Sequence, residues 1–152
     1  MIKVIAVDDE PAFAEILGIY LRELDDFEVE IFTSPEKALD YLNSNPVDAV
    51  ISDYMMEEMD GISFFRMVQT CSAGLPFVLL TGRDDQATIL AAIKAGIDFI
   101  QFKSEEPSVL FTEISQKIKS SVGKYRANQE IQSGIRQREM FFSIQRDLMN
   151  RL

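Results

Sequence analysis

The chain of 152 residues contains no histidine and no tryptophan, and it has a single cysteine, Cys71. Without histidine, the usual histidine general base and the histidine-ligated zinc site are excluded, so any metal site has to be built from oxygen ligands. One cysteine cannot form a disulfide within the chain. Because the N-terminal residues also show no signal-peptide pattern, we expect a cytoplasmic protein.

Long apolar runs and excess positive charge are missing as well. No apolar stretch approaches the roughly 20 residues that span a bilayer, so we expect no membrane association. The formal net charge is −10, and it is unevenly spread: residues 1–122 hold 9 Lys and Arg against 22 Asp and Glu, whereas residues 123–152 hold 6 against 3. Because an acidic surface disfavours contact with nucleic-acid phosphates, we expect no direct nucleic-acid binding.

Apolar runs of strand length alternate with segments of helical period along residues 1–121. We expect strands at about 3–8, 28–32, 48–53, 76–81 and 98–102, and helices at about 11–24, 35–44, 61–72, 84–95 and 106–121. Five such alternations predict an α/β domain with a doubly wound parallel sheet. Residues 122–152 lack a strand pattern and carry apolar residues at helical spacing, which predicts a C-terminal helical extension or linker.

Polar residues stand at the ends of four predicted strands: Asp8-Asp9, Asp53, Thr81 and Lys103. In a doubly wound sheet, ligands bind outside the carboxyl ends of the strands, so we expect these side chains to meet at one edge. A carboxylate such as Asp53 can act as a nucleophile toward phosphorus. A divalent cation held by carboxylates would relieve the repulsion between two anions, and Mg²⁺ suits such oxygen ligands.

Each of these residues also has a simpler explanation. Asp8-Asp9 taken alone is equally consistent with a cap for the helix that begins near Pro11. Asp53 alone would be a solvated loop acid, Thr81 a turn residue, and Lys103 a counter-charge for the acid excess. The clustered site is the preferred interpretation because every member falls at a strand end of the same topology.

Four segments together resemble the receiver domain of the response regulators of two-component, or phosphorelay, signalling systems. The segments are Val7–Pro11, Asp53–Met56 with Met59–Gly61, Pro76–Gly82, and Ala95–Ile100 leading to Lys103. The resemblance covers about residues 1–121 and implies a flavodoxin-like sheet of strand order 2-1-3-4-5, followed by an extra C-terminal helix.

The resemblance also implies a function. A histidine kinase or phosphotransfer protein would phosphorylate Asp53, and Thr81 and Lys103 would contact the phosphoryl group. Mg²⁺ would be held by Asp8, Asp9, Asp53 and the backbone carbonyl of Met55. The domain would be a signalling switch rather than a turnover enzyme, with self-phosphotransfer and autodephosphorylation only.

Three positions differ from the family pattern. Glu57 and Ser104 stand where proline is usual, so a trans peptide bond is expected before Ser104. Ile100 stands at the switch position, where the family usually has an aromatic residue that moves together with the residue equivalent to Thr81.

Two other functions remain open at this point. A Mg²⁺-dependent aspartyl-phosphate phosphatase would need a second acid two residues after its nucleophile, where this chain has Met55. A pseudo-receiver would act as an interaction module without phosphate control. The C-terminal extension, residues 122–152, would either form a homodimer or connect the domain to a fused sensor or kinase module.

Overall fold

The structure is a computed structural model that describes residues 1–24, 26–82 and 86–151. Strands and helices alternate through these residues. They are β1 (Ile2–Val7), α1 (Pro11–Glu23), β2 (Phe27–Phe32), α2 (Pro35–Ser44), β3 (Ala49–Asp53), α3 (Gly61–Cys71), β4 (Phe77–Thr81), α4 (Gln86–Ala95), β5 (Phe99–Phe102) and α5 (Pro107–Asn150).

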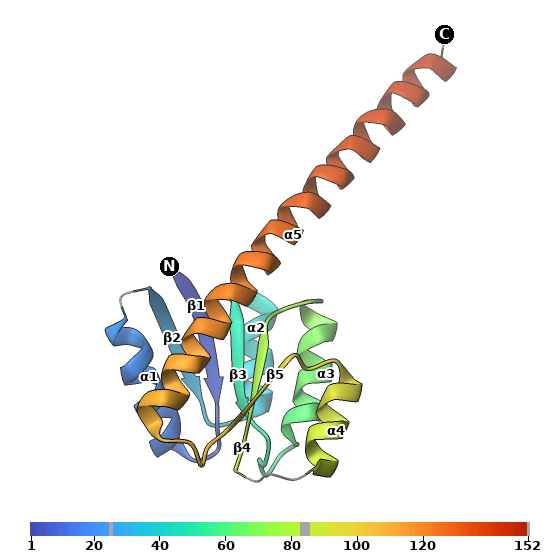
Figure 1. The fold of residues 1–152 in the computed structure, drawn as a ribbon. Helices are drawn as coiled ribbons and strands as arrows, with labels where there is room; N and C mark the ends of the chain where they lie inside the picture. Colours follow the sequence, from blue (N-terminus) through green and yellow to red (C-terminus); the bar gives the residue numbers. More distant parts are fainter. Residues whose placement is uncertain (25, 83–85, 152) are drawn as a thin grey trace. The chain divides into compact units, whose positions relative to one another are not determined.

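The strands form one parallel sheet in the order β2-β1-β3-β4-β5 (Figure 1). This confirms the α/β class, the doubly wound topology and the predicted strand order. The register pairs Val7 with Ser52 and Thr81 with Phe102. The carboxyl ends of β1, β3, β4 and β5 therefore lie along one edge, which places the residues that follow these strands close together.

The local sequence explains where several helices begin. Ser34 caps α2 by accepting a hydrogen bond from the Lys37 N–H at 3.3 Å, and proline follows it at the first helical position. The Asp60 carboxylate caps α3 in the same way, through the Ser63 N–H at 2.8 Å. The start predicted for the fourth helix, at residue 84, lies outside the described residues.

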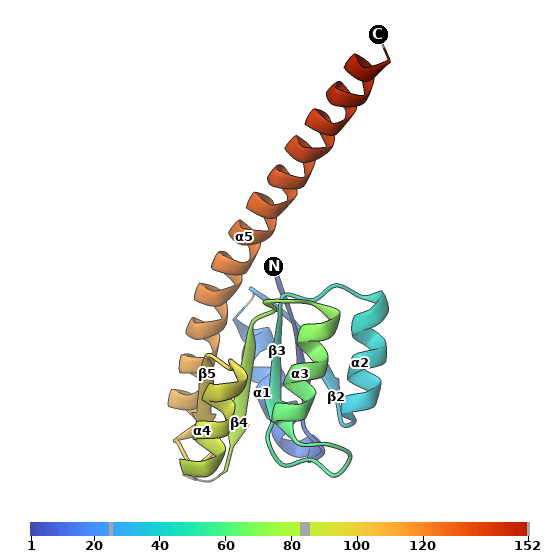
Figure 2. The same ribbon diagram turned by 90° about the vertical axis from the view of Figure 1, so that its right-hand side faces the viewer.

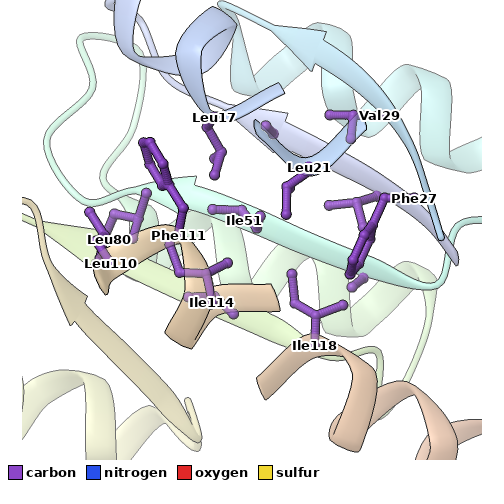
Figure 3. Packing of buried hydrophobic residues seen from close by; sticks show 14 of the residues in the cluster. Leu17, Leu21, Phe27, Val29, Ile51, Leu80, Leu110, Phe111, Ile114 and Ile118 are labelled. Atoms are coloured by element: carbon purple, nitrogen blue, oxygen red, sulfur yellow. The ribbon is translucent and has the colours of Figure 1, made fainter. Parts of the chain in front are cut away.

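The hydrophobic core fills both sides of the sheet. Figure 3 shows Leu17 and Leu21 of α1 and Ile114 of α5 against Ile51 of the sheet, all at most 1% exposed. Helices α1 and the part of α5 up to Val122 cover this face, and α2, α3 and α4 cover the other (Figures 1 and 2). Burial on both faces explains why β1, β3 and β4 are continuous apolar runs.

The chain divides into two compact units, Met1–Val122 and Gly123–Leu152. Helix α5 continues without interruption through Gly123 and Gly134 to Asn150. In the second unit the large apolar side chains remain exposed, for example Phe142 at 59% and Leu148 at 57%. None of the helices in the described residues combines the length and apolar character needed to cross a bilayer.

Candidate functional site

Three aspartates meet at the carboxyl edge of the sheet. Asp53 is the last residue of β3, and Asp8 and Asp9 directly follow β1. One carboxylate oxygen from each of the three lies within 4.8 Å of the others. Asp8 is 3% exposed and Asp53 is 8% exposed, whereas Asp9 is half-buried. The structure thus brings together the acids that the strand-end argument selected.

Lys103 brings a positive charge to this cluster from the end of β5. Its Nζ lies 2.8 Å from Asp8 Oδ2 and 3.2 Å from Asp53 Oδ1. The backbone N–H of Lys103 donates to the Thr81 carbonyl at 2.9 Å, which fixes where its side chain starts. Its ammonium also lies 4.4 Å from the ring centroid of Phe13 in α1, a cation–π contact that the sequence analysis did not identify.

Crowding of these charges changes the ionisation of Asp53. Burial and the neighbouring charge of Asp8 raise the pKa of Asp53 from 3.8 to about 6, although Lys103 and the Tyr54 N–H, 3.0 Å from Oδ1, act in the opposite direction. For Lys103, burial opposes the charged form. The hydrogen bond to Asp8 and the charge of Asp53 outweigh burial and raise the pKa of Lys103, so its ammonium stays charged.

Backbone N–H groups orient two of the acids. Asp8 Oδ1 accepts from the Glu10 N–H at 2.9 Å, within the turn that precedes α1. Asp9 Oδ2 accepts from the Glu57 N–H at 3.2 Å. The second contact crosses 48 residues of sequence and was missed, because nothing in the local pattern of the loop after β3 indicates its direction.

The remaining candidate residues lie at or near the same edge. Thr81 ends β4 and is 4% exposed. Met55 lies in the loop after β3, and its side chain is exposed, whereas the proposed ligand is its backbone carbonyl. Ile100 lies in β5, opposite Leu79 of β4. Peptide bonds in the described residues are trans, including the bond that precedes Ser104.

The donor set fits a hard divalent cation. Three carboxylates offer oxygen atoms within 4.8 Å of one another, and Mg²⁺ prefers oxygen ligands. Two of these carboxylates are buried, and the Lys103 ammonium, which pairs with Asp8 and Asp53, carries one positive charge against three negative ones. The Asp8, Asp9 and Asp53 cluster therefore has both the ligands and the uncompensated charge that a cation site requires.

Comparison with known proteins identifies related proteins and folds. The transcriptional regulatory protein GlrR of Escherichia coli is 31% identical over 115 residues, which cover 76% of this chain and 26% of GlrR. The DNA-binding response regulator MtrA of Mycolicibacterium smegmatis is 28% identical over 117 residues, covering 77% of this chain and 50% of MtrA. The chain thus spans between a quarter and a half of the length of these relatives.

Solved structures share the fold of most of the chain. A Francisella response regulator receiver domain has a TM-score of 0.70 at 22% identity and covers 80% of this chain and 99% of its own. A receiver domain protein from Methanospirillum hungatei has a TM-score of 0.71 at 19% identity, covering 82% and 98%. A family model described as the response regulator receiver domain matches residues 4–115. The chain therefore belongs to the response regulator receiver domain family of two-component signalling systems.

Proposed function

We propose that Asp53 is the phosphoacceptor of this receiver domain. The supporting observation is its position: a buried carboxylate at the end of β3 that shares the Lys103 ammonium with Asp8. An oxygen of Asp53 would attack the phosphorus of a phosphohistidine on a histidine kinase or phosphotransfer protein. The phosphorus–nitrogen bond would break, and the imidazole would keep its electron pair.

Each neighbour of Asp53 has a separate role in this proposal. Asp8, Asp9, Asp53 and the Met55 carbonyl would hold Mg²⁺, which, when bound, neutralises charge on the transferring group. The Lys103 ammonium is already within 3.2 Å of Asp53, so it is positioned to pair with a phosphoryl oxygen. The Thr81 hydroxyl, at the adjacent strand end, would donate to another phosphoryl oxygen.

The acid set favours a switch over the alternatives. A phosphatase of the aspartyl-phosphate type would need an acid where Met55 stands, so a turnover enzyme is disfavoured. A pseudo-receiver would need neither the cluster of Asp8, Asp9 and Asp53 nor the pairing of Lys103 with Asp8 and Asp53. A cytoplasmic location, where a histidine kinase would meet this domain, is part of the same proposal.

We also propose that residues 1–121 form the receiver and that residues 122–152 form an extension that pairs with another helix. The support is the exposed apolar side chains of the tail, such as Phe141 at 58% and Phe142 at 59%. The partner would be a second copy of this chain or a sensor or kinase module fused to it. Removing residues 123–152 and measuring the mass in solution tests this, and an unchanged oligomeric state would count against it.

Treatment with acetyl phosphate and Mg²⁺, followed by mass spectrometry, tests the phosphoacceptor. We expect a single phosphoryl group on Asp53 and none on an Asp53→Asn variant. Beryllofluoride with Mg²⁺ should bind the wild-type protein and change its unfolding temperature. If neither reagent acts on a folded wild-type protein, Asp53 is not a phosphoacceptor.

A further inference from the structure

Two neighbouring residues of the loop between β3 and α3, residues 54–60, contact parts of the chain that are distant in sequence. The Glu57 N–H donates to Asp9 Oδ2 at 3.2 Å, so the loop contacts the acid cluster directly. The next residue, Glu58, reaches in another direction and accepts hydrogen bonds from Ser34 Oγ at 2.9 Å and 3.0 Å. One short segment therefore connects a candidate metal ligand to the start of α2.

Ser34 is a well-defined anchor for this loop. It is 9% exposed and caps α2, where its hydroxyl accepts from the Lys37 N–H and donates to Glu58. The Glu36 N–H also points at Glu58 Oε2, 3.4 Å away. The Glu58 carboxylate thus lies at the N-terminus of α2, where the helix dipole favours negative charge. Helix capping and hydrogen bonding act together to fix residue 58.

We propose that the Glu57 backbone N–H, held in place by the Glu58–Ser34 contact, positions Asp9 for cation binding. The proposal rests on the proposed function, since it concerns the cation that Asp9 would hold. Proline has no N–H, so this contact exists only because residue 57 is not proline. Glu57 and Glu58 act here as positioning residues, because neither would touch the cation.

The chemistry of a carboxylate explains why this contact helps rather than competes. Asp9 has two oxygens, and using Oδ2 for the Glu57 N–H leaves Oδ1 and the remaining lone pairs for a cation. Asp9 is only half-buried, so packing alone does not fix its side chain. Hydrogen bonds that orient metal ligands typically change metal affinity by about 10- to 100-fold when removed.

Mg²⁺ titration calorimetry on four variants of the full chain tests the proposal. Glu57→Pro and Glu57→Ala both remove the same negative charge, but only the proline removes the N–H. We expect Glu57→Pro to bind Mg²⁺ about tenfold more weakly than Glu57→Ala. Glu58→Ala and Glu58→Gln form a second matched pair, in which only glutamine keeps an oxygen for Ser34. We expect Glu58→Ala to bind about threefold to fivefold more weakly than Glu58→Gln.

A measurement without metal separates positioning from general loss of structure. Amide hydrogen exchange at Glu57 in metal-free protein should be faster in Glu58→Ala than in Glu58→Gln, while exchange in β1 and β3 stays unchanged. Equal Mg²⁺ affinities within both pairs would overturn the proposal, because only charge would then matter. If wild-type protein binds no Mg²⁺, the cation part of the proposed function fails together with this inference. If the wild-type protein binds Mg²⁺ and the affinities do not differ within either pair of variants, the inference is overturned and the proposed function still stands.

Discussion

The acid cluster should make the metal-free protein less stable than a variant that lacks one of its charges. We expect Asp53→Asn, which keeps the size of the side chain, to be more stable than wild type near neutral pH. The reason is that burial and Asp8 together raise the pKa of Asp53 from 3.8 to about 6. An acid with a raised pKa in the folded state is more easily ionised in the unfolded state, so ionisation favours unfolding.

The magnitude follows from the pKa difference. A separation of about 2 pKa units corresponds to about 3 kcal/mol, because each unit is worth about 1.4 kcal/mol. The sign fixes the pH window. The contribution of Asp53 to stability is fully present below its unfolded-state pKa near 4, and it is lost as the pH rises through its folded-state pKa of about 6. Asparagine has no such titration. The stability difference between Asp53→Asn and wild type should therefore be about 3 kcal/mol near pH 7.5 and clearly smaller near pH 5.

Urea denaturation in EDTA at these two pH values measures the difference. The lower pH is kept above the isoelectric point of about 4.5 to preserve solubility. Asp40→Asn is the control, because it removes the same charge from an exposed position on α2, and we expect it to lie within about 0.5 kcal/mol of wild type at both values. If Asp53→Asn is no more stable than wild type near pH 7.5, charge crowding at the cluster is refuted.

Three further outcomes are expected from the same geometry. Lys103→Met removes the ammonium that pairs with two carboxylates and should lower the free energy of unfolding by about 3 kcal/mol in EDTA; a loss below about 1 kcal/mol would contradict the ion pairs. Gly61→Ala should lower the free energy of unfolding by about 1–3 kcal/mol, because the new Cβ would lie 2.5 Å from the Asp53 carbonyl oxygen. At Gly123 an added Cβ meets no atom within 4 Å, so Gly123→Ala should leave the free energy of unfolding unchanged or raise it by up to about 1 kcal/mol. Urea denaturation measures both. Mg²⁺ at about 100 times its dissociation constant should raise the free energy of unfolding by about 2.7 kcal/mol, and Asp9→Asn should lose most of this gain in a thermal shift titration.

The sheet and the acid cluster were predictable from the sequence because both follow from topology. Continuous apolar runs indicate strands buried on both faces, and their alternation with helices leaves few possible sheets. Once the strands are parallel, residues such as Asp53 and Lys103 that follow them must lie at one edge. The predicted strands agree with β1 to β5 within one residue at their ends. No information about side-chain direction was needed.

The finer contacts of the site could not be predicted, because they do not follow from the topology of the sheet. The cation–π contact between Lys103 and Phe13 and the hydrogen bonds from Ser34 to Glu58 depend on where loops and helix faces point in three dimensions. The length of α5 was also not predictable. With Gly123 and Gly134 in it, the sequence of the tail is consistent with one long helix or a broken one; a glycine costs a helix only about 1 kcal/mol, and α5 continues through both.

The crowding that lowers stability is compatible with the proposed chemistry of Asp53. With a pKa of about 6, the carboxylate is still almost entirely ionised near pH 7.5, so the nucleophile is present. The Lys103 ammonium, 3.2 Å from Asp53 Oδ1 and 2.8 Å from Asp8 Oδ2, offsets part of the cost in stability. In the proposed function a bound cation would offset more of that cost and would neutralise charge on the incoming phosphoryl group, while Asp53 stays ionised.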